Sequence, residues 1–179
     1  MFGHLLFLVF SGYIYYLVIL DDFTHYCWTF PLHHKSDVYE HIVQFISDVQ
    51  TQFSLPVKCF QTDNGKEFIN TPTTTFLASR GIIFRHSCPY TSPQNGKAER
   101  VLRTLNNFVR TLLMHASMPP QYWAEALSVA TYLLNRRPST SISGEIPYVP
   151  LHGSPPTYDH LKVLGASITL ISRRARLIS

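Results

Sequence analysis

The order of hydrophobic patterns along the chain limits what it can fold into more than any other feature. Two short runs rich in β-branched and aromatic residues, 13–20 and 26–32, are joined by the polar stretch 21–25, which predicts an antiparallel hairpin. Apolar residues then recur every three or four positions from Val38 to Phe53, which indicates an amphipathic helix. This order predicts helices packed on a sheet.

Strands and helices continue to alternate in the next part of the chain. Residues 57–62 are predicted to form a strand that ends at a turn beginning with Asp63. A short helix from Thr74 to Arg80 and a strand over 82–84 follow, so the order becomes β, β, α, β, α, β. That order predicts one α/β domain in which strands and helices share a core.

Two longer amphipathic helices complete the predicted domain. One begins at Lys97, after a connection rich in Pro, Ser, Asn and Gly, and the other covers 122–135. Beyond Pro138 the composition turns to Pro, Ser and Gly, and no element is predicted. The predicted boundaries are an atypical apolar segment over 1–10, a catalytic-core domain over 11–137 and an extension over 138–179.

The composition is that of a globular chain with a modest positive charge. Of the 179 residues, 45% are hydrophobic and 15% are charged, which excludes a disordered chain. The formal net charge of +4 suits a polyanionic partner, but the same balance also occurs in proteins without one. The three cysteines form no Cys-x-x-Cys pair, so neither a zinc knuckle nor a disulfide framework is indicated.

The first twenty residues contain no Asp, Glu, Lys or Arg and are long enough to cross a membrane as a helix. Against a membrane span, Ser11 and Gly12 interrupt the apolar run, no basic region precedes it, and 13–20 has the composition of a buried strand. A membrane partner is therefore not expected, and a membrane anchor over 1–20 is kept as an alternative.

Two carboxylates stand where metal ligands are often found. Asp63 follows a predicted strand, and Glu99 lies in the first turn of a predicted helix. Carboxylates so placed can converge on hard divalent cations, which prefer oxygen ligands and bind phosphates through their remaining positions. Alternatively, Asp63 caps its own turn and Glu99 complements the helix dipole, and the spacing alone does not separate these two interpretations.

The segments around both acids resemble the integrase core of copia-type retrotransposons, within the retroviral-type integrase superfamily. Residues 62–68 read Thr-Asp-Asn-Gly-Lys-Glu-Phe, and residues 89–100 read Pro-Tyr-Thr-Ser-Pro-Gln-Asn-Gly-Lys-Ala-Glu-Arg. The resemblance covers nearly everything from Ser11 to Gly165, including the motifs Asp21-Asp22-Phe23, Tyr122-Trp123-Ala124 and Asn135-Arg136.

The resemblance implies an RNase H-like fold, a mixed β-sheet flanked by α-helices, in a polyprotein fragment that cleaves DNA as an endonuclease and joins element ends to target DNA. It implies Mg²⁺ or Mn²⁺ as the cofactor, with Asp63 and Glu99 as the second and third catalytic acids and metal ligands. It also implies a homo-oligomer and a nuclear location for the parent integrase. The residues expected to contact DNA are Gln94, Asn95, Lys97, Arg100 and Arg103, although the cations among them can equally belong to a solvated helix face.

The sequence departs from the family pattern at the first catalytic acid. The segment that carries this Asp in the family lies upstream of the first hairpin strand, and here residues 1–6 read Met-Phe-Gly-His-Leu-Leu. Asp21 and Asp22 are the nearest acids, but they match a family position that is not catalytic. We therefore predict an integrase core whose chemistry is impaired, with a catalytically dead nucleic-acid-binding or interaction remnant as the alternative. A one-base shift of reading frame would account for the apolar start.

Overall fold

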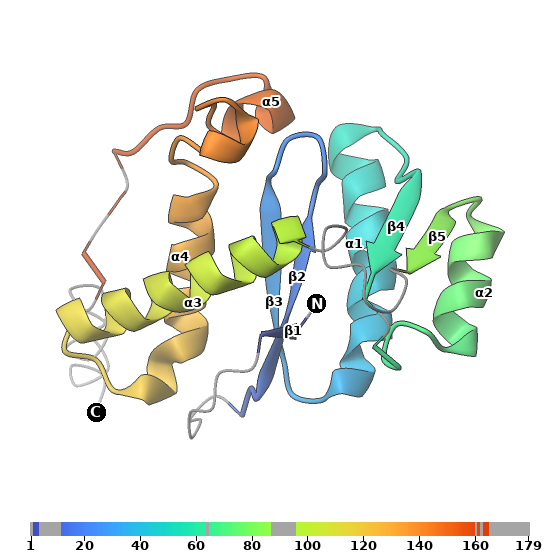
Figure 1. The fold of residues 1–179 in the computed structure, drawn as a ribbon, viewed down its shortest axis with the longest axis horizontal. Helices are drawn as coiled ribbons and strands as arrows, with labels where there is room; N and C mark the ends of the chain where they lie inside the picture. Colours follow the sequence, from blue (N-terminus) through green and yellow to red (C-terminus); the bar gives the residue numbers. More distant parts are fainter. Residues whose placement is uncertain are drawn as a thin grey trace, which may run out of the picture.

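A computed structural model describes residues 12–63, 65–86, 96–159, 161 and 163–164, together with the backbone of residues 2–3. Its strands lie in two ladders (Figure 1). Strands β2 (Tyr15–Leu20) and β3 (Cys27–Leu32) form the expected antiparallel hairpin, and the short β1 (Phe2–Gly3) pairs antiparallel with β2. Strands β4 (Cys59–Thr62) and β5 (Ile83–His86) form a separate parallel ladder.

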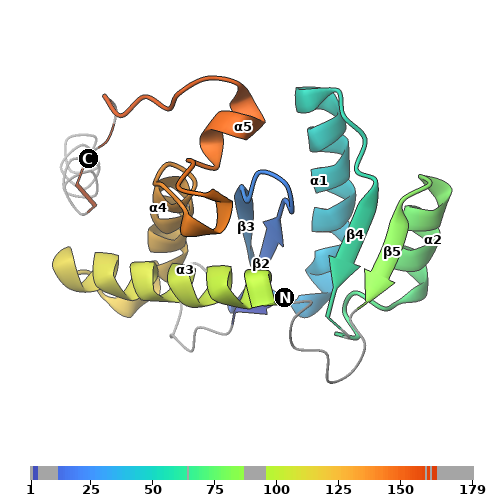
Figure 2. The same ribbon diagram turned by 45° about the horizontal axis from the view of Figure 1, so that its top comes forward.

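The two faces of β2 pack into two different hydrophobic clusters. Tyr16 and Val18 lie in a cluster with α3 (Gly96–His115) and α4 (Trp123–Leu134). Leu17 and Ile19, on the opposite face because side chains alternate along a strand, lie in a cluster with α1 (Val38–Phe53), α2 (Thr71–Ser79) and β4. The hairpin is therefore enclosed between α3 and α4 on one side and α1 on the other (Figures 1 and 2).

Local capping decides where the first two helices begin and end. The turn η1 (Lys35–Asp37) precedes α1, and the Asp37 carboxylate accepts a hydrogen bond of 2.8 Å from the backbone N–H of His34. Helix α2 begins earlier than predicted, because the side chain of Asn70 accepts a hydrogen bond of 2.9 Å from Thr73 N–H and caps it. Gly81, with φ at +67°, follows the helix in the left-handed region, as expected for a terminating glycine.

A buried amide joins α4 to the hairpin. The side chain of Asn135, directly after α4, accepts a hydrogen bond of 2.8 Å from the backbone N–H of Cys27 and donates one of 2.7 Å to the backbone oxygen of the same residue. Thr131 and Thr29 add a hydroxyl contact of 2.8 Å between the same two elements. Asn135 is only 2% exposed, so these bonds form away from water.

The segment after Pro138, in which no element was predicted, contains the short helices η4 (Thr140–Ile142) and α5 (Tyr148–His152). A further short helix, η3 (Pro120–Tyr122), lies before α4. The N–H of Tyr148 donates to the Asn135 oxygen at 2.9 Å, and the Tyr158 hydroxyl donates to the Arg136 oxygen at 2.9 Å. Residues 165–179 lie outside the described part of the chain.

The described residues contain no helix that is both long enough and apolar enough to cross a membrane. In the alternative anchor over 1–20, residues 15–20 form strand β2, and residues 4–11 lie outside the described residues.

Candidate nucleic-acid and metal site

Asp63 directly follows β4 and is half-buried. Its Oδ1 accepts a hydrogen bond of 3.3 Å from the N–H of Gly65, which closes the turn. A Cβ added to Gly65 would lie 2.8 Å from Oε1 of Glu67 and 3.2 Å from Oδ1 of Asp63, so this turn brings two carboxylates close to one glycine. Glu67, which sequence reasoning did not single out, also lies 4.0 Å from the Nζ of Lys35.

Glu99 is exposed in the first turn of α3. The buried residues of α3 recur at intervals of three and four, which is the pattern of an amphipathic helix with one face packed against the hydrophobic core. Glu99, three positions before Leu102, lies at the margin of this buried face, whereas Arg100 lies on the opposite side of the helix. The buried residues are Leu102, Leu105, Val109 and Leu113.

The grouping of possible metal ligands can be checked in the described part of the chain. Among the described residues, no three His, Cys, Asp or Glu side chains are grouped so that they could hold one ion. All eleven Asp and Glu residues of the chain lie in its described part. Paired divalent cations are usually held by several carboxylates together.

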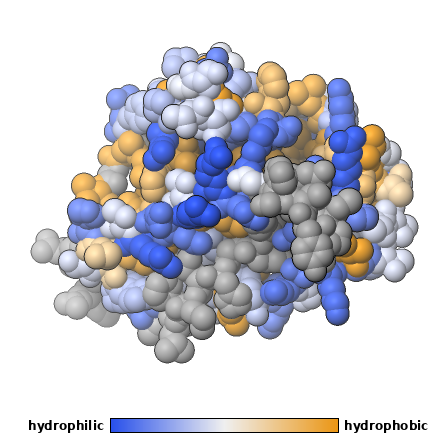
Figure 3. All heavy atoms as spheres, in the orientation of Figure 1, coloured by the Kyte–Doolittle hydropathy of each residue, from blue (hydrophilic) through white to orange (hydrophobic). Residues whose placement is uncertain are grey.

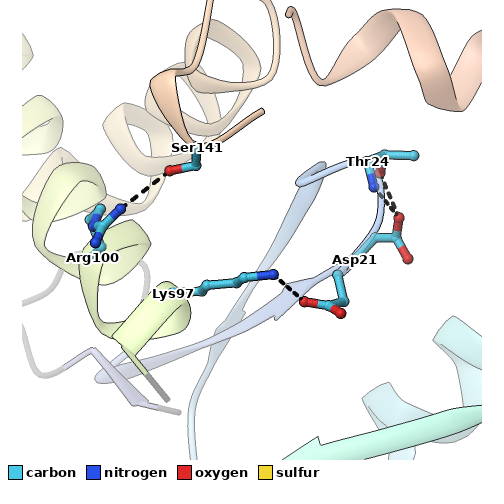
Figure 4. A network of polar contacts seen from close by, with 6 residues as sticks. Asp21, Thr24, Lys97, Arg100 and Ser141 are labelled. Atoms are coloured by element: carbon cyan, nitrogen blue, oxygen red, sulfur yellow. Dashed lines mark hydrogen bonds and ion pairs between the residues drawn. The ribbon is translucent and has the colours of Figure 1, made fainter. Parts of the chain in front are cut away.

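The two acids of the hairpin turn are already engaged. Oδ2 of Asp21 accepts hydrogen bonds from the N–H and the hydroxyl of Thr24, at 2.8 and 2.7 Å. Oδ1 of Asp22 lies 2.6 Å from Nζ of Lys97, and Figure 4 shows Lys97 reaching from α3 toward the turn. The hydrogen bond from Lys97 lowers the pKa of Asp22, against a smaller opposing effect of burial.

The predicted DNA-contacting cations lie on the outward face of α3. Lys97, Arg100 and Arg103 are all exposed, and Figure 3 shows hydrophilic side chains gathered over this helix. Arg100 donates a long hydrogen bond of 3.3 Å to the hydroxyl of Ser141 in η4, a contact that the sequence did not predict (Figure 4). Gln94 and Asn95 lie outside the described residues.

Comparison with known proteins identifies relatives of this chain. A model of the integrase core domain family matches residues 5–92. The chain is 39% and 38% identical, over 157 residues each, to the retrovirus-related Pol polyproteins from transposons RE2 and RE1 of Arabidopsis thaliana. It is 33% identical over 155 residues to the Pol polyprotein from transposon TNT 1-94 of Nicotiana tabacum. These matches cover 87–88% of this chain but only 11–12% of the polyproteins, so the chain spans a small part of its relatives.

A solved structure shares the fold. One chain of a simian T-cell lymphotropic virus intasome, determined by cryo-electron microscopy in complex with PP2A regulatory subunit B56 gamma, aligns with a TM-score of 0.65 at 19% identity. The alignment covers 87% of this chain and 55% of that one. The α/β architecture, with an antiparallel and a parallel ladder flanked by helices, is thus the RNase H-like fold that the resemblance implied. From the family match, the relatives and this fold, the chain belongs to the integrase core family of copia-type retrotransposons.

Proposed function

We propose that this chain binds DNA along the outward face of α3, as the core of an integrase that acts on element ends and target DNA. The observation that carries the proposal is the exposed cations Arg100 and Arg103 on the same helix as Glu99, one turn and two turns after Lys97, which is paired with Asp22. Cations contact phosphates without regard to base sequence and position a protein on the duplex. The buried face of α3 fixes these side chains relative to the hairpin and to α4.

We propose further that these 179 residues bind Mg²⁺ or Mn²⁺ poorly and neither cleave nor join DNA. Asp63 and Glu99 match the second and third acids of the family motifs, but no cluster of three possible metal ligands occurs among the described residues. The chain then acts as a nucleic-acid-binding remnant of an integrase. For the parent integrase, a nuclear location and a homo-oligomeric state follow as parts of the same proposal.

Titration calorimetry with Mn²⁺ and a strand-transfer assay on duplex DNA test this proposal together. The wild-type chain is compared with Asp63→Asn and Glu99→Gln, and with Glu40→Gln as a control at an exposed acid of α1. The expected result is salt-sensitive DNA binding, with no saturable Mn²⁺ binding and no joined product for any variant. Saturable Mn²⁺ binding that both site variants lose and the control keeps, together with joined DNA, would show that the core is active.

DNA binding itself is tested by fluorescence anisotropy on the same duplex. The wild type is expected to bind more weakly as salt rises, because displaced counterions drive the association. If it does not bind at low salt, the proposal fails whatever the metal result.

A further inference from the structure

Phe23, at the tip of the β2–β3 hairpin, is the most exposed large hydrophobic side chain among the described residues, at 83%. A single apolar side chain on a surface is ordinary and needs no explanation. Phe23 differs because the backbone that carries it is fixed, and because the fixed turn lies beside a row of cations. These two features together suggest what the ring contacts.

The turn that carries Phe23 is closed by several hydrogen bonds. The Asp21 carboxylate accepts hydrogen bonds from both the N–H and the hydroxyl of Thr24. Thr24 is only 5% exposed. The Asp21 N–H donates to the Tyr26 oxygen at 2.9 Å, and the His25 N–H donates to the Asp21 oxygen at 3.0 Å. Phe23 therefore projects from a backbone with little freedom, so that ordering it against a ligand costs little conformational entropy.

The same turn is fastened to the helix of the proposed DNA-binding face. Asp22, the residue before Phe23, is bound at 2.6 Å to Lys97. Lys97 is two positions before Glu99 and three before Arg100, so this contact places the turn that carries Phe23 next to the first turn of α3. A DNA molecule lying along the cations of α3 passes the hairpin tip.

The groups nearest Phe23 carry charges of both signs. Asp21 keeps its negative charge within the turn, because its hydrogen-bond donors are neutral, and the charge of Asp22 is offset by Lys97. The exposed cations that would hold the DNA backbone, Arg100 and Arg103, lie farther along α3. A contact of Phe23 with DNA therefore depends on stacking of its ring on a base and not on charge at the hairpin tip.

We propose that Phe23 stacks on an unpaired or terminal base of DNA bound along α3. This inference rests on the proposed function, because it assumes that α3 holds DNA. An aromatic side chain stacks on any base whose face is free, whereas the bases inside a duplex are covered by their neighbours. The ring would thus favour DNA ends and single-stranded overhangs over continuous duplex.

A comparison of two DNA probes tests the stacking. Both carry the same duplex and an overhang of the same length, but the overhang of one has bases and that of the other is abasic, so their phosphate charge is equal. The wild type is expected to bind the base-bearing probe more tightly, and Phe23→Ala is expected to lose about 5-fold to 160-fold in affinity for it, the range measured for one stacked base. On the abasic probe, wild type and Phe23→Ala are expected to bind equally.

Two further variants separate stacking from simple apolar contact. Phe23→Trp keeps a ring and is expected to keep the preference for bases, whereas Phe23→Leu keeps an apolar side chain without a ring and is expected to lose most of it. Circular dichroism melting of each variant confirms an unchanged fold, as expected for a side chain that is 83% exposed.

The outcomes distinguish this inference from the proposed function. If the wild type binds both probes equally well, DNA binding stands and the stacking is refuted. If Phe23→Ala weakens the binding of both probes equally, Phe23 makes a different contact and the inference is also refuted. A change in the sedimentation of the free chain would refute it in the same way. If the wild type binds neither probe, the proposed function itself has failed.

Discussion

At the scale of single residues, buried polar groups hold the parts of this domain together. Asn135 satisfies both backbone groups of Cys27 with one side chain, at 2.8 and 2.7 Å, across a sequence separation of 108 residues. The burial that protects these bonds also raises the pKa of the Cys27 thiol to about 12, so the thiol stays protonated and unreactive at neutral pH. Cys27 therefore has a packing role and not a reactive one.

Replacing Asn135 with alanine leaves the N–H and the oxygen of Cys27 without partners in a dry environment. Each buried, unsatisfied group costs about 1–3 kcal/mol, so Asn135→Ala is expected to lower the free energy of unfolding by about 2–4 kcal/mol. Urea denaturation measures the loss. Ser128→Ala, at an exposed position of α4, is the matched control and is expected to change stability by less than about 0.5 kcal/mol. A loss for Asn135→Ala no larger than that of the control would contradict this account.

Spacing in the sequence was sufficient to place Asp63 after a strand and Glu99 in the first turn of a helix. It was not sufficient to pair side chains that are distant in the sequence. Lys97 was expected to be free for DNA, yet it is held by Asp22, 75 residues earlier. Such a contact depends on how the hairpin and α3 pack together, which no local pattern encodes.

At the scale of elements, the contact between Asp22 and Lys97 joins the hairpin turn to α3, and its strength depends on pH. The pKa of Asp22 is lowered in the folded chain, chiefly by the hydrogen bond from Lys97. A lowered carboxyl pKa means that the contact contributes fully above the ordinary Asp pKa of about 3.9 and is lost as the pH falls through the folded value.

A ¹³C NMR titration of the Asp22 carboxyl group is expected to show a midpoint below that of a free Asp. Lys97→Ala removes the hydrogen bond that causes the shift, so the midpoint is expected to return toward the ordinary value. Lys58→Ala, at an exposed lysine before β4, is expected to leave it unchanged. Equal midpoints in the wild type and Lys97→Ala would mean that the pair does not form in solution.

Helix α3 presents Arg103 and Arg110 on the same outward face, seven positions apart. If DNA lies along this face, replacing both with glutamine is expected to weaken binding for every duplex sequence. The slope of log K against log salt is expected to become shallower by about 0.9 for each lost phosphate contact, or about 1.8 for two. Anisotropy at several salt concentrations measures the slope, and Arg80→Gln after α2 is the control. An unchanged slope would place the DNA elsewhere.

The long, strongly periodic helices were predicted closely, and the short ones were not. The interval from Val38 to Phe53 matches α1, because its apolar repeat is long enough to define both ends. Helix α2 was predicted to begin at Thr74, and the cap at Asn70 was missed. The short α5 has no such repeat, and its place depends on contacts with distant residues, such as the N–H of Tyr148 bound to Asn135.

At the scale of the whole molecule, the described strands form two ladders that are held together by packing. Strand β2 belongs to both hydrophobic clusters, whereas β4 has β5 as its one ladder neighbour among the described residues. The resemblance predicted one mixed sheet, and among the described residues antiparallel and parallel pairing are both present, but in two separate ladders. The frame-shift hypothesis for residues 1–10 stays a prediction, which the genomic DNA in the alternative frames can test.

The two ladders are expected to differ in how readily their backbone hydrogen bonds open to solvent. Amides of β2 and β3 are expected to exchange with solvent more slowly than those of β4 and β5, because β2 is buried on both faces and β5 is largely exposed. Native-state hydrogen exchange followed by NMR measures both sets. Equal protection throughout would show that the two ladders open as one cooperative unit.

The buried amide of Asn135 also affects how the molecule meets other molecules. Strand β3 is the last strand of its ladder, and the final strand of an open sheet presents unpaired backbone groups that can recruit a strand from another chain. By occupying both groups of Cys27, Asn135 removes one of these pairing positions from the edge of the sheet. The residue that fastens α4 to the hairpin thereby also guards the sheet against edge-to-edge aggregation.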